Sequence, residues 1–111
     1  MARMLYLASL EPDSGKSVAA LWLMDLLTRD SGVVGYLRPV VNDPQHDHRV
    51  ELIAGLFPNE APSGHPLQVC VHSADEVENA IADGRSQEIF TSILEAAHEL
   101  GEHCDVVLVD G

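Results

Sequence analysis

Short apolar runs alternate along the chain with segments whose apolar residues recur at helical spacing. Few polar residues interrupt three of these runs, Met4–Ser9, Val33–Leu37 and Asp105–Asp110. Such runs are typical of strands that are buried on both faces of a parallel sheet. Leu67–Val71 could form a further short strand. Because strands alternate with helices, the pattern predicts right-handed crossovers and an α/β domain with a parallel sheet.

Four segments show the helical pattern, and their ends carry recognisable signals. The predicted helices span residues 17–28, 49–57, 73–83 and 86–100. Ser73 followed by Glu76 forms a capping box, which marks the start of the third helix. The last helix has an apolar stripe of Ile89, Ile93, Ala97 and Leu100, which Phe90 and Leu94 widen. Pro39 is expected to end the second strand, because proline cannot donate a ladder hydrogen bond.

The first strand leads into a loop that ends in Gly15-Lys16-Ser17, the sequence that closes a phosphate-binding loop. Backbone N–H groups at the start of the following helix attract an anion. Ser14, Gly15 and Lys16 are therefore predicted to bind phosphate, and Ser17 to bind phosphate and, through its hydroxyl, Mg²⁺. A strand before the loop and a helix after it are the context that such a loop requires.

The loop departs from the G-x-x-x-x-G-K-[ST] pattern, since Leu10 stands at the position of the first glycine. Glu11 and Asp13 also place two carboxylates beside a site for phosphate. Like charges ~4 Å apart repel by about 1 kcal/mol in water and by about 4 kcal/mol at an effective dielectric constant of about 20. Two interpretations stay open: a loop that binds ATP with Mg²⁺, and a loop that is retained only as architecture.

Composition narrows the classes of function. The 111 residues suffice for one small domain, so residues 1–111 are treated as a single unit. The formal net charge of −12 argues against nucleic acid and against an anionic membrane surface as partners. No apolar run reaches the ~18 residues of a membrane span, and no secretory signal is recognisable, so we expect a cytoplasmic protein. Cys70 and Cys104 are too far apart for a C-x-x-C motif and are expected to be buried thiols.

Three stretches together resemble the dethiobiotin-synthetase-like P-loop family. They are the loop up to Ser17, Gly35–Val40 (Gly-Tyr-Leu-Arg-Pro-Val) and Val107–Gly111 (Val-Leu-Val-Asp-Gly). Over nearly the whole chain, the sequence is also similar to the N-terminal domain of long-form phosphate acetyltransferases, which is itself dethiobiotin-synthetase-like. The resemblance implies a three-layer P-loop NTPase-like fold with a parallel sheet. Because such domains continue beyond this last motif, it also implies that residues 1–111 are the N-terminal part of a domain that is incomplete at its C-terminus.

The resemblance further implies roles for three residues outside the loop. Asp47 and Asp110 resemble the carboxylates with which the synthetase completes a Mg²⁺ site together with Ser17. Arg38 replaces the synthetase lysine and could pair with a phosphate as a guanidinium fork. Each of the three has a structural alternative. Asp47 could cap the following helix, Asp110 could be an ordinary strand-end acid, and Arg38 could form a surface ion pair.

In long-form phosphate acetyltransferases, the site that interconverts acetyl-CoA plus phosphate with acetyl phosphate plus CoA lies in a later domain. The resemblance thus implies a regulatory or structural domain without catalytic residues, which responds to a small-molecule effector such as a nucleotide or another metabolite. The alternative is an ATP- and Mg²⁺-dependent enzyme of the dethiobiotin synthetase or cobyrinate diamide synthetase type, which activates a carbamate or a carboxylate. A third interpretation is a structural piece without a ligand. An uncovered sheet edge would favour a homo-oligomer.

Overall fold

The computed structural model describes residues 2–7, 16–57, 64 and 66–111, apart from the side chains of Lys16, Ser17 and Ser31. Its strands are β1 (Arg3–Leu7), β2 (Val34–Val41), β3 (Gln68–Ser73) and β4 (Val106–Asp110). Its helices are α1 (Lys16–Ser31), α2 (His48–Leu56), α3 (Ala74–Ala82) and α4 (Ser86–Gly101). Each predicted strand and helix therefore has a counterpart in the structure.

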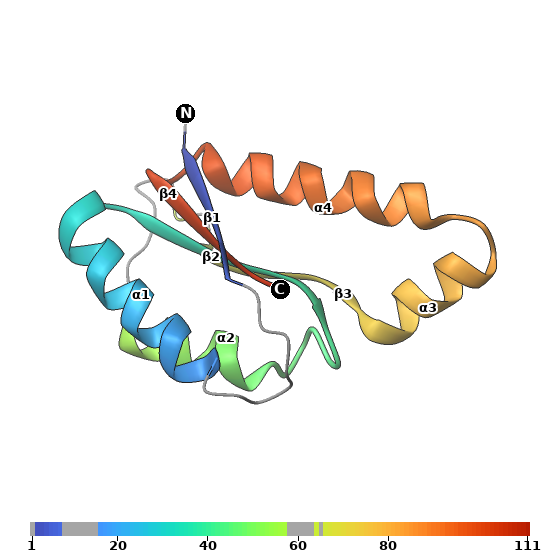
Figure 1. Cartoon of the computed structure of the whole chain (residues 1–111), viewed down its shortest axis with the longest axis horizontal. Helices are drawn as coiled ribbons and strands as arrows, with labels where there is room; N and C mark the ends of the chain where they lie inside the picture. The colour runs from blue at the N-terminus through green and yellow to red at the C-terminus, as the bar shows by residue number, and fades with distance from the viewer. Residues whose placement is uncertain (1, 8–15, 58–63, 65) are drawn as a thin grey trace.

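The strands form one parallel sheet in the order β1-β4-β2-β3 (Figure 1). Helices α1 and α2 lie on one face of this sheet and α4 lies on the other, while α3 lies beyond the end of β3 (Figure 1). Strand side chains alternate between the two faces, so β2 and β4 supply buried residues to both helical layers. The predicted α/β fold with a parallel sheet is confirmed.

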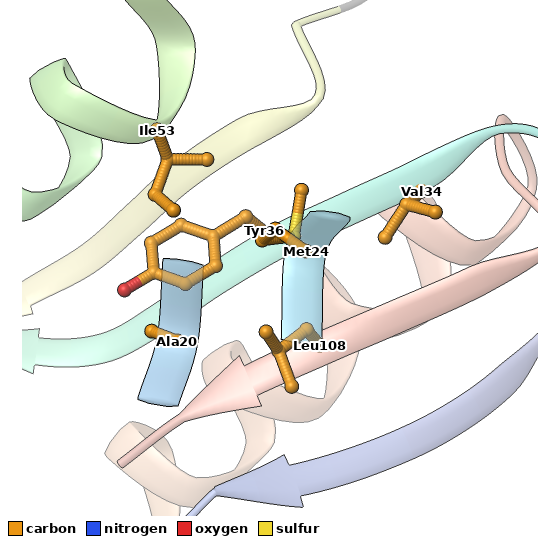
Figure 2. Packing of buried hydrophobic residues seen from close by; sticks show 6 residues of the cluster. All are labelled: Ala20, Met24, Val34, Tyr36, Ile53 and Leu108. Carbon is orange, nitrogen blue, oxygen red and sulfur yellow. The ribbon is translucent and has the colours of Figure 1, made fainter. Parts of the chain in front are cut away.

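The apolar core has one half on each face of the sheet. The half beneath α1 and α2 consists of Ala20, Met24, Val34, Tyr36, Ile53 and Leu108 (Figure 2). The half beneath α4 consists of Leu37, Leu67, Leu100, Val107 and Val109. Every residue of β4 is buried, because this strand lies between β1 and β2 and contributes to both halves. Such burial is what an almost wholly apolar run predicts for an interior strand.

One predicted boundary is wrong, since β2 does not stop before Pro39 but continues to Val41. The register of β2 with β4 ends where Leu37 lies opposite Val109. Beyond that point, β2 pairs only with β3 among the strands that the structure describes. Pro39 therefore lies where one side of the strand has no ladder to complete, and proline is tolerated at such an edge. The extension carries Arg38 beyond the end of the β2–β4 ladder.

The predicted capping box at the start of α3 is confirmed. Ser73 Oγ accepts a hydrogen bond from the Glu76 backbone N–H at 3.1 Å, and Glu76 Oε1 accepts one from the Ser73 backbone N–H at 3.3 Å. The helix is capped at its other end by Asp83, and the following Gly84 has a φ of +74°. Glycine adopts this left-handed conformation without steric cost, which explains why the chain turns there toward α4.

Several large apolar side chains lie on the surface. Trp22 of α1 is 62% exposed and belongs to the surface rather than to the core. The apolar stripe of α4 is narrower than expected, because Phe90 and Leu94 are exposed. Leu5 and Tyr6 of the edge strand β1 are exposed as well. Within the described residues, none of the helices combines the length and the hydropathy that crossing a membrane would require.

Candidate functional site

The carboxyl ends of the strands bring several predicted site residues to one edge of the sheet. Leu7 at the end of β1 lies opposite Asp110 at the end of β4, and the Gly111 N–H donates to the Leu7 carbonyl at 3.1 Å. The amino end of α1, at Lys16, faces the same edge (Figure 1). Arg38 lies on the extension of β2 beyond β4. Ligands of parallel α/β sheets bind outside this edge, so Arg38 and Asp110 lie where a ligand site is expected.

The phosphate-binding loop itself is largely outside the described residues. Ser14 and Gly15 fall in the segment 8–15, and only the backbone of Lys16 and Ser17 is described. Helix α1 begins at Lys16, the residue that follows Gly15, as the loop pattern requires. The phosphate role of these four residues stays a prediction.

Asp110 is fully buried and accepts two hydrogen bonds on its Oδ2 atom. Arg49 Nη1, from the first turn of α2, donates at 2.9 Å, and the Tyr36 hydroxyl of β2 donates to the same oxygen. The Arg49 side chain is only 14% exposed. The Tyr36 ring packs in the core beneath α1 and α2, and its hydroxyl points away from Met24 and Val34 (Figure 2). The guanidinium of Arg49 thus lies against the buried carboxylate and offsets its charge.

The surroundings hold Tyr36 and Arg49 in the protonation states that this arrangement requires. Burial raises the pKa of Tyr36 far above its ordinary value, and the hydrogen bond and charge of Asp110 raise it further, while the charges of Arg38 and Arg49 oppose the rise. Burial by itself lowers the pKa of Arg49, but the hydrogen bond to Asp110 and the charge of Asp110 outweigh it, so the pKa is raised. Tyr36 is therefore a neutral donor and Arg49 a cation at physiological pH.

A second ion pair lies beside the first. Arg38 Nη1 donates to Asp47 Oδ1 at 2.6 Å, and Asp47 Oδ2 accepts a hydrogen bond from the Val50 N–H at 3.0 Å. Asp47 is therefore the N-cap of α2, which is the structural alternative that the sequence offered for this residue. It is also the ion-pair partner of Arg38. Arg38 Nε is buried and has no hydrogen-bond partner within the described part of the chain. That N–H is a donor that a ligand oxygen could satisfy.

These pairings bear on the predicted Mg²⁺ site of Ser17, Asp47 and Asp110. Mg²⁺ demands near-octahedral oxygen ligands and usually keeps several of its waters. A guanidinium lies against each of the two carboxylates, at 2.6 Å from Asp47 and 2.9 Å from Asp110. As arranged, Asp47 and Asp110 therefore do not fit a hydrated divalent cation. The side chain of Ser17 lies outside the described residues, and the metal role of the three stays a prediction.

A separate polar cluster ties β3 to α3 and α4. His72 Nδ1 lies 3.0 Å from Glu76 Oε2, and His72 Nε2 lies 2.5 Å from Ser92 Oγ. A serine, a histidine and a carboxylate at these distances resemble a nucleophile with its base. However, Ser92 lies within α4 and its hydroxyl also contacts the Ile89 carbonyl at 2.9 Å, while the adjacent cavity is lined by His72 and Glu76 but not by Ser92. The cluster is therefore structural: its hydrogen bonds hold β3 against α3 and α4.

The pH dependence of the free energy of unfolding is expected to reveal the contribution of the His72–Glu76 hydrogen bond. The hydrogen bond from His72 is the main cause that lowers the pKa of Glu76, and the capping bond from Ser73 adds to it. A carboxylate whose pKa is lower in the folded chain contributes stability above the ordinary glutamate value of about 4.3. This contribution is lost as pH falls through the folded pKa. Urea unfolding between neutral and acid pH should therefore show a smaller acid loss for Glu76→Gln than for the wild type.

The control for that measurement is Glu78→Gln, which removes a carboxylate from an exposed side chain of the same helix, outside the capping box. The acid loss of this variant should match that of the wild type. Glutamine at position 76 can still accept the capping hydrogen bond, so the comparison isolates the charge. An acid loss that is identical for wild type and Glu76→Gln would contradict the prediction.

Other candidate groups do not assemble into a site. In the described residues, no three His, Cys, Asp or Glu side chains gather as a set of metal ligands. Cys70 and Cys104 are thiols, as predicted, but each is half-buried rather than buried. Burial raises the pKa of both, so neither is activated as a thiolate.

Sequence reasoning missed two residues of the site, Tyr36 and Arg49. Tyr36 is part of the Gly-Tyr motif by which the family was recognised, but that motif assigned no role to its hydroxyl. Arg49 lies 61 residues from Asp110 in sequence and two residues after the N-cap Asp47. A cation in the first turn of a helix gains nothing from the helix dipole, and this could have indicated that Arg49 has a partner elsewhere.

Comparisons with known proteins place this chain in a family. The AAA domain family AAA_26 matches residues 3–111. The phosphate acetyltransferase of Synechocystis sp. is 27% identical over 114 aligned positions, and that of Nitratidesulfovibrio vulgaris is 30% identical over the same number. Both alignments cover 100% of this chain but 16% of the relative, within its N-terminal region. No solved structure gives a significant match.

The match extends over nearly the whole chain, and the parallel sheet agrees with a P-loop fold. A P-loop domain is consistent with the binding of a nucleotide and Mg²⁺. The chain spans about a sixth of the length of the curated relatives that it matches. It belongs to the AAA_26 family of AAA domains.

Proposed function

We propose that this chain is a non-catalytic regulatory or structural domain of a phosphate acetyltransferase and that it binds a small phosphorylated effector. In the whole enzyme, acetyl-CoA and phosphate would be interconverted with acetyl phosphate and CoA in another domain. The family match and the names of the two relatives support this assignment. The effector would be a nucleotide or another phosphoryl metabolite of the cytoplasm, bound at the carboxyl edge of the sheet.

The observation that carries the proposal is the chemistry of this edge. The buried Nε–H of Arg38 has no partner within the described residues, and the amino end of α1 faces the same edge. Both attract an anion, the first through a charge-assisted hydrogen bond and the second through backbone N–H groups. A phosphoryl group between Arg38 and the predicted loop residue Lys16 would satisfy both.

The same edge supports a binding role rather than acetyl transfer. Transfer between acetyl-CoA and phosphate needs a site that positions both substrates and stabilises a developing oxyanion. The charged side chains described at this edge, Arg38, Asp47, Arg49 and Asp110, are paired with one another. We therefore expect the 111-residue chain to make no acetyl phosphate by itself.

The proposal includes self-association. β1 is an edge strand, and its Leu5 and Tyr6 are exposed together with Val18 and Trp22 of α1. An uncovered strand edge offers unpaired backbone groups to another chain. Sedimentation of the purified chain is expected to give a homo-oligomer, and a strict monomer at high concentration would contradict this part of the proposal.

Replacement of Lys16 is expected to abolish phosphate binding. In Lys16→Ala the loop loses the cation that the pattern places on the β- and γ-phosphates, while the start of α1 is kept because alanine favours helices. Calorimetric titration with ATP and with inorganic phosphate should show binding to the wild type and none to the variant. Urea unfolding should give similar stability for both.

The matched control is Arg29→Ala, which removes a cation near the other end of the same helix, where Arg29 pairs with Asp25 on the surface. This variant should bind like the wild type. Equal binding by Lys16→Ala would contradict the proposed site. ATP hydrolysis at roughly 1 s⁻¹ or faster, lost in Lys16→Ala, would instead favour an ATP-dependent carboxylate- or carbamate-activating enzyme.

A further inference from the structure

The two ion pairs at the carboxyl edge each join the start of α2 to the end of a strand. The start of α2 supplies an acid at its N-cap, Asp47, and a base in its first turn, Arg49. Asp47 pairs with Arg38 of β2 at 2.6 Å, and Arg49 pairs with Asp110 of β4 at 2.9 Å. Each pair is charge-balanced by itself, and together they fix the start of α2 over the ends of two neighbouring strands.

We infer that the Arg49 guanidinium is the resident counter-cation of Asp110, in the place where a P-loop domain would hold a divalent cation, so that this edge binds its phosphoryl ligand without Mg²⁺. The first half of the inference stands on the ion pair alone. The second half rests on the proposed function, because it concerns the ligand.

The environment of Asp110 argues against a cation in addition to Arg49. The side chain has no exposed surface, and its Oδ2 already accepts from Arg49 and from the Tyr36 hydroxyl. Mg²⁺ gives up its waters reluctantly, so a carboxylate without solvent contact offers it no room while the guanidinium is present. A divalent ion beside Arg49 would also be repelled twice as strongly as a single charge.

Arg49 itself is unable to leave the pair by losing its proton, because guanidinium groups stay charged in proteins. Departure would instead carry a largely buried cation into water and take the guanidinium away from a buried carboxylate, which is unfavourable. Tyr36 adds to this by holding the carboxylate from the side of the core. Asp47 would have to give up both Arg38 and the Val50 N–H before it could face a metal.

The first test measures Mg²⁺ binding directly, without any nucleotide. Melting temperatures are recorded at increasing MgCl₂ for wild type, Arg49→Met, the double variant Arg49→Met/Asp110→Asn, and the control Arg29→Met. The wild type and Arg29→Met should show no specific shift. Arg49→Met should rise by roughly 4–8 °C at millimolar Mg²⁺, because Asp110 becomes available to the ion. The double variant should lose this rise.

Each outcome of that titration decides the first half of the inference. A Mg²⁺ shift in the wild type as large as in Arg49→Met overturns it, because Arg49 would then not hold the position. The absence of a shift in every variant also overturns it, because Asp110 would then not be a place for a cation. If Arg49→Met does not fold without Mg²⁺, recovery of its folding by Mg²⁺, but not by NaCl of equal ionic strength, is the supporting result. If Mg²⁺ does not recover its folding, the inference is overturned, because Asp110 would then not be a place for a cation.

The second test compares ATP binding by the wild type in EDTA and in MgCl₂. The ratio of the two dissociation constants should be close to one. A dissociation constant that falls tenfold or more with Mg²⁺ overturns the second half of the inference and leaves the proposed function intact. Failure to bind ATP and phosphate in either buffer counts against the proposed function and against metal-free ligand binding. The role of Arg49 is decided separately, by the Mg²⁺ titration alone.

Discussion

Breaking the Arg49–Asp110 pair from either side is expected to lower the free energy of unfolding by about 3–5 kcal/mol. Arg49→Met leaves the fully buried Asp110 without its guanidinium, and Asp110→Asn leaves a largely buried Arg49 without its carboxylate. The cost arises because the charge that stays behind loses its ion-pair partner in a poorly hydrated place. Since small domains are stable by roughly 5–15 kcal/mol, either change would remove a large part of the total.

The double variant Arg49→Met/Asp110→Asn distinguishes this mechanism from a general loss of packing. Once both charges are gone, no uncompensated ion is left, so the double variant should lose less than the sum of the single losses by roughly 0.5–3 kcal/mol. Urea unfolding of all four proteins at neutral pH provides the measurement. Arg29→Met is the control, because its exposed pair with Asp25 should be worth less than about 1 kcal/mol.

Strictly additive losses in this cycle would contradict the structure. They would indicate that Arg49 and Asp110 contribute to stability independently, although the structure places their side chains 2.9 Å apart. The same cycle with Tyr36→Phe in place of Arg49→Met would then show whether the phenol is the dominant partner of Asp110.

The strands of the sheet and their parallel direction could be predicted from the sequence because burial on two faces leaves a clear pattern, whereas the strand order could not. The run that ends at Asp110 is apolar throughout, and the structure buries every residue of β4. The capping box Ser73–Glu76 was equally readable, since it depends on neighbours along the chain. Features set by local sequence or by total burial are thus the ones that were anticipated correctly.

The errors concern features set by neighbours in space. Pro39 was expected to end β2, but the rule depends on whether an adjacent strand needs that N–H, and β4 has ended before this point. Phe90 and Leu94 have the right spacing for the apolar face of α4, yet both are exposed. Periodicity gives the direction of an apolar face, whereas its buried width depends on how far the sheet extends beneath the helix.

In the candidate site, too, the positions of residues could be predicted from the sequence, whereas their partners in space could not. The positions of Arg38 and Asp110 at the carboxyl edge followed from the parallel sheet, which brings all strand ends to one side. Their ion-pair partners did not follow, because Arg49 reaches Asp110 across 61 residues of sequence. The N-cap role of Asp47 was foreseen as an alternative, but its simultaneous pairing with Arg38 was not. A long-range charge pair leaves no periodic signal in one sequence.

Leu108→Ala is expected to lower the free energy of unfolding by about 2–5 kcal/mol. Leu108 is fully buried in the central strand β4 and packs with Ala20, Met24, Tyr36 and Ile53 (Figure 2). These neighbours come from two helices and from β2, so they are unable to collapse together into the space that the leucine leaves. The loss therefore includes a cavity as well as the transfer free energy of the missing methyl groups. Urea unfolding measures it directly.

Leu94→Ala is the matched control, since the same atoms are removed from a side chain that is 51% exposed on α4. Surface changes of this kind usually stay within about 0.5 kcal/mol. A loss at Leu94 that approaches the loss at Leu108 would mean that the outer face of α4 is covered in solution. In that case the loss should depend on protein concentration, because association stabilises by mass action. A large loss at Leu94 that is independent of concentration would contradict the burial that the structure assigns to α4.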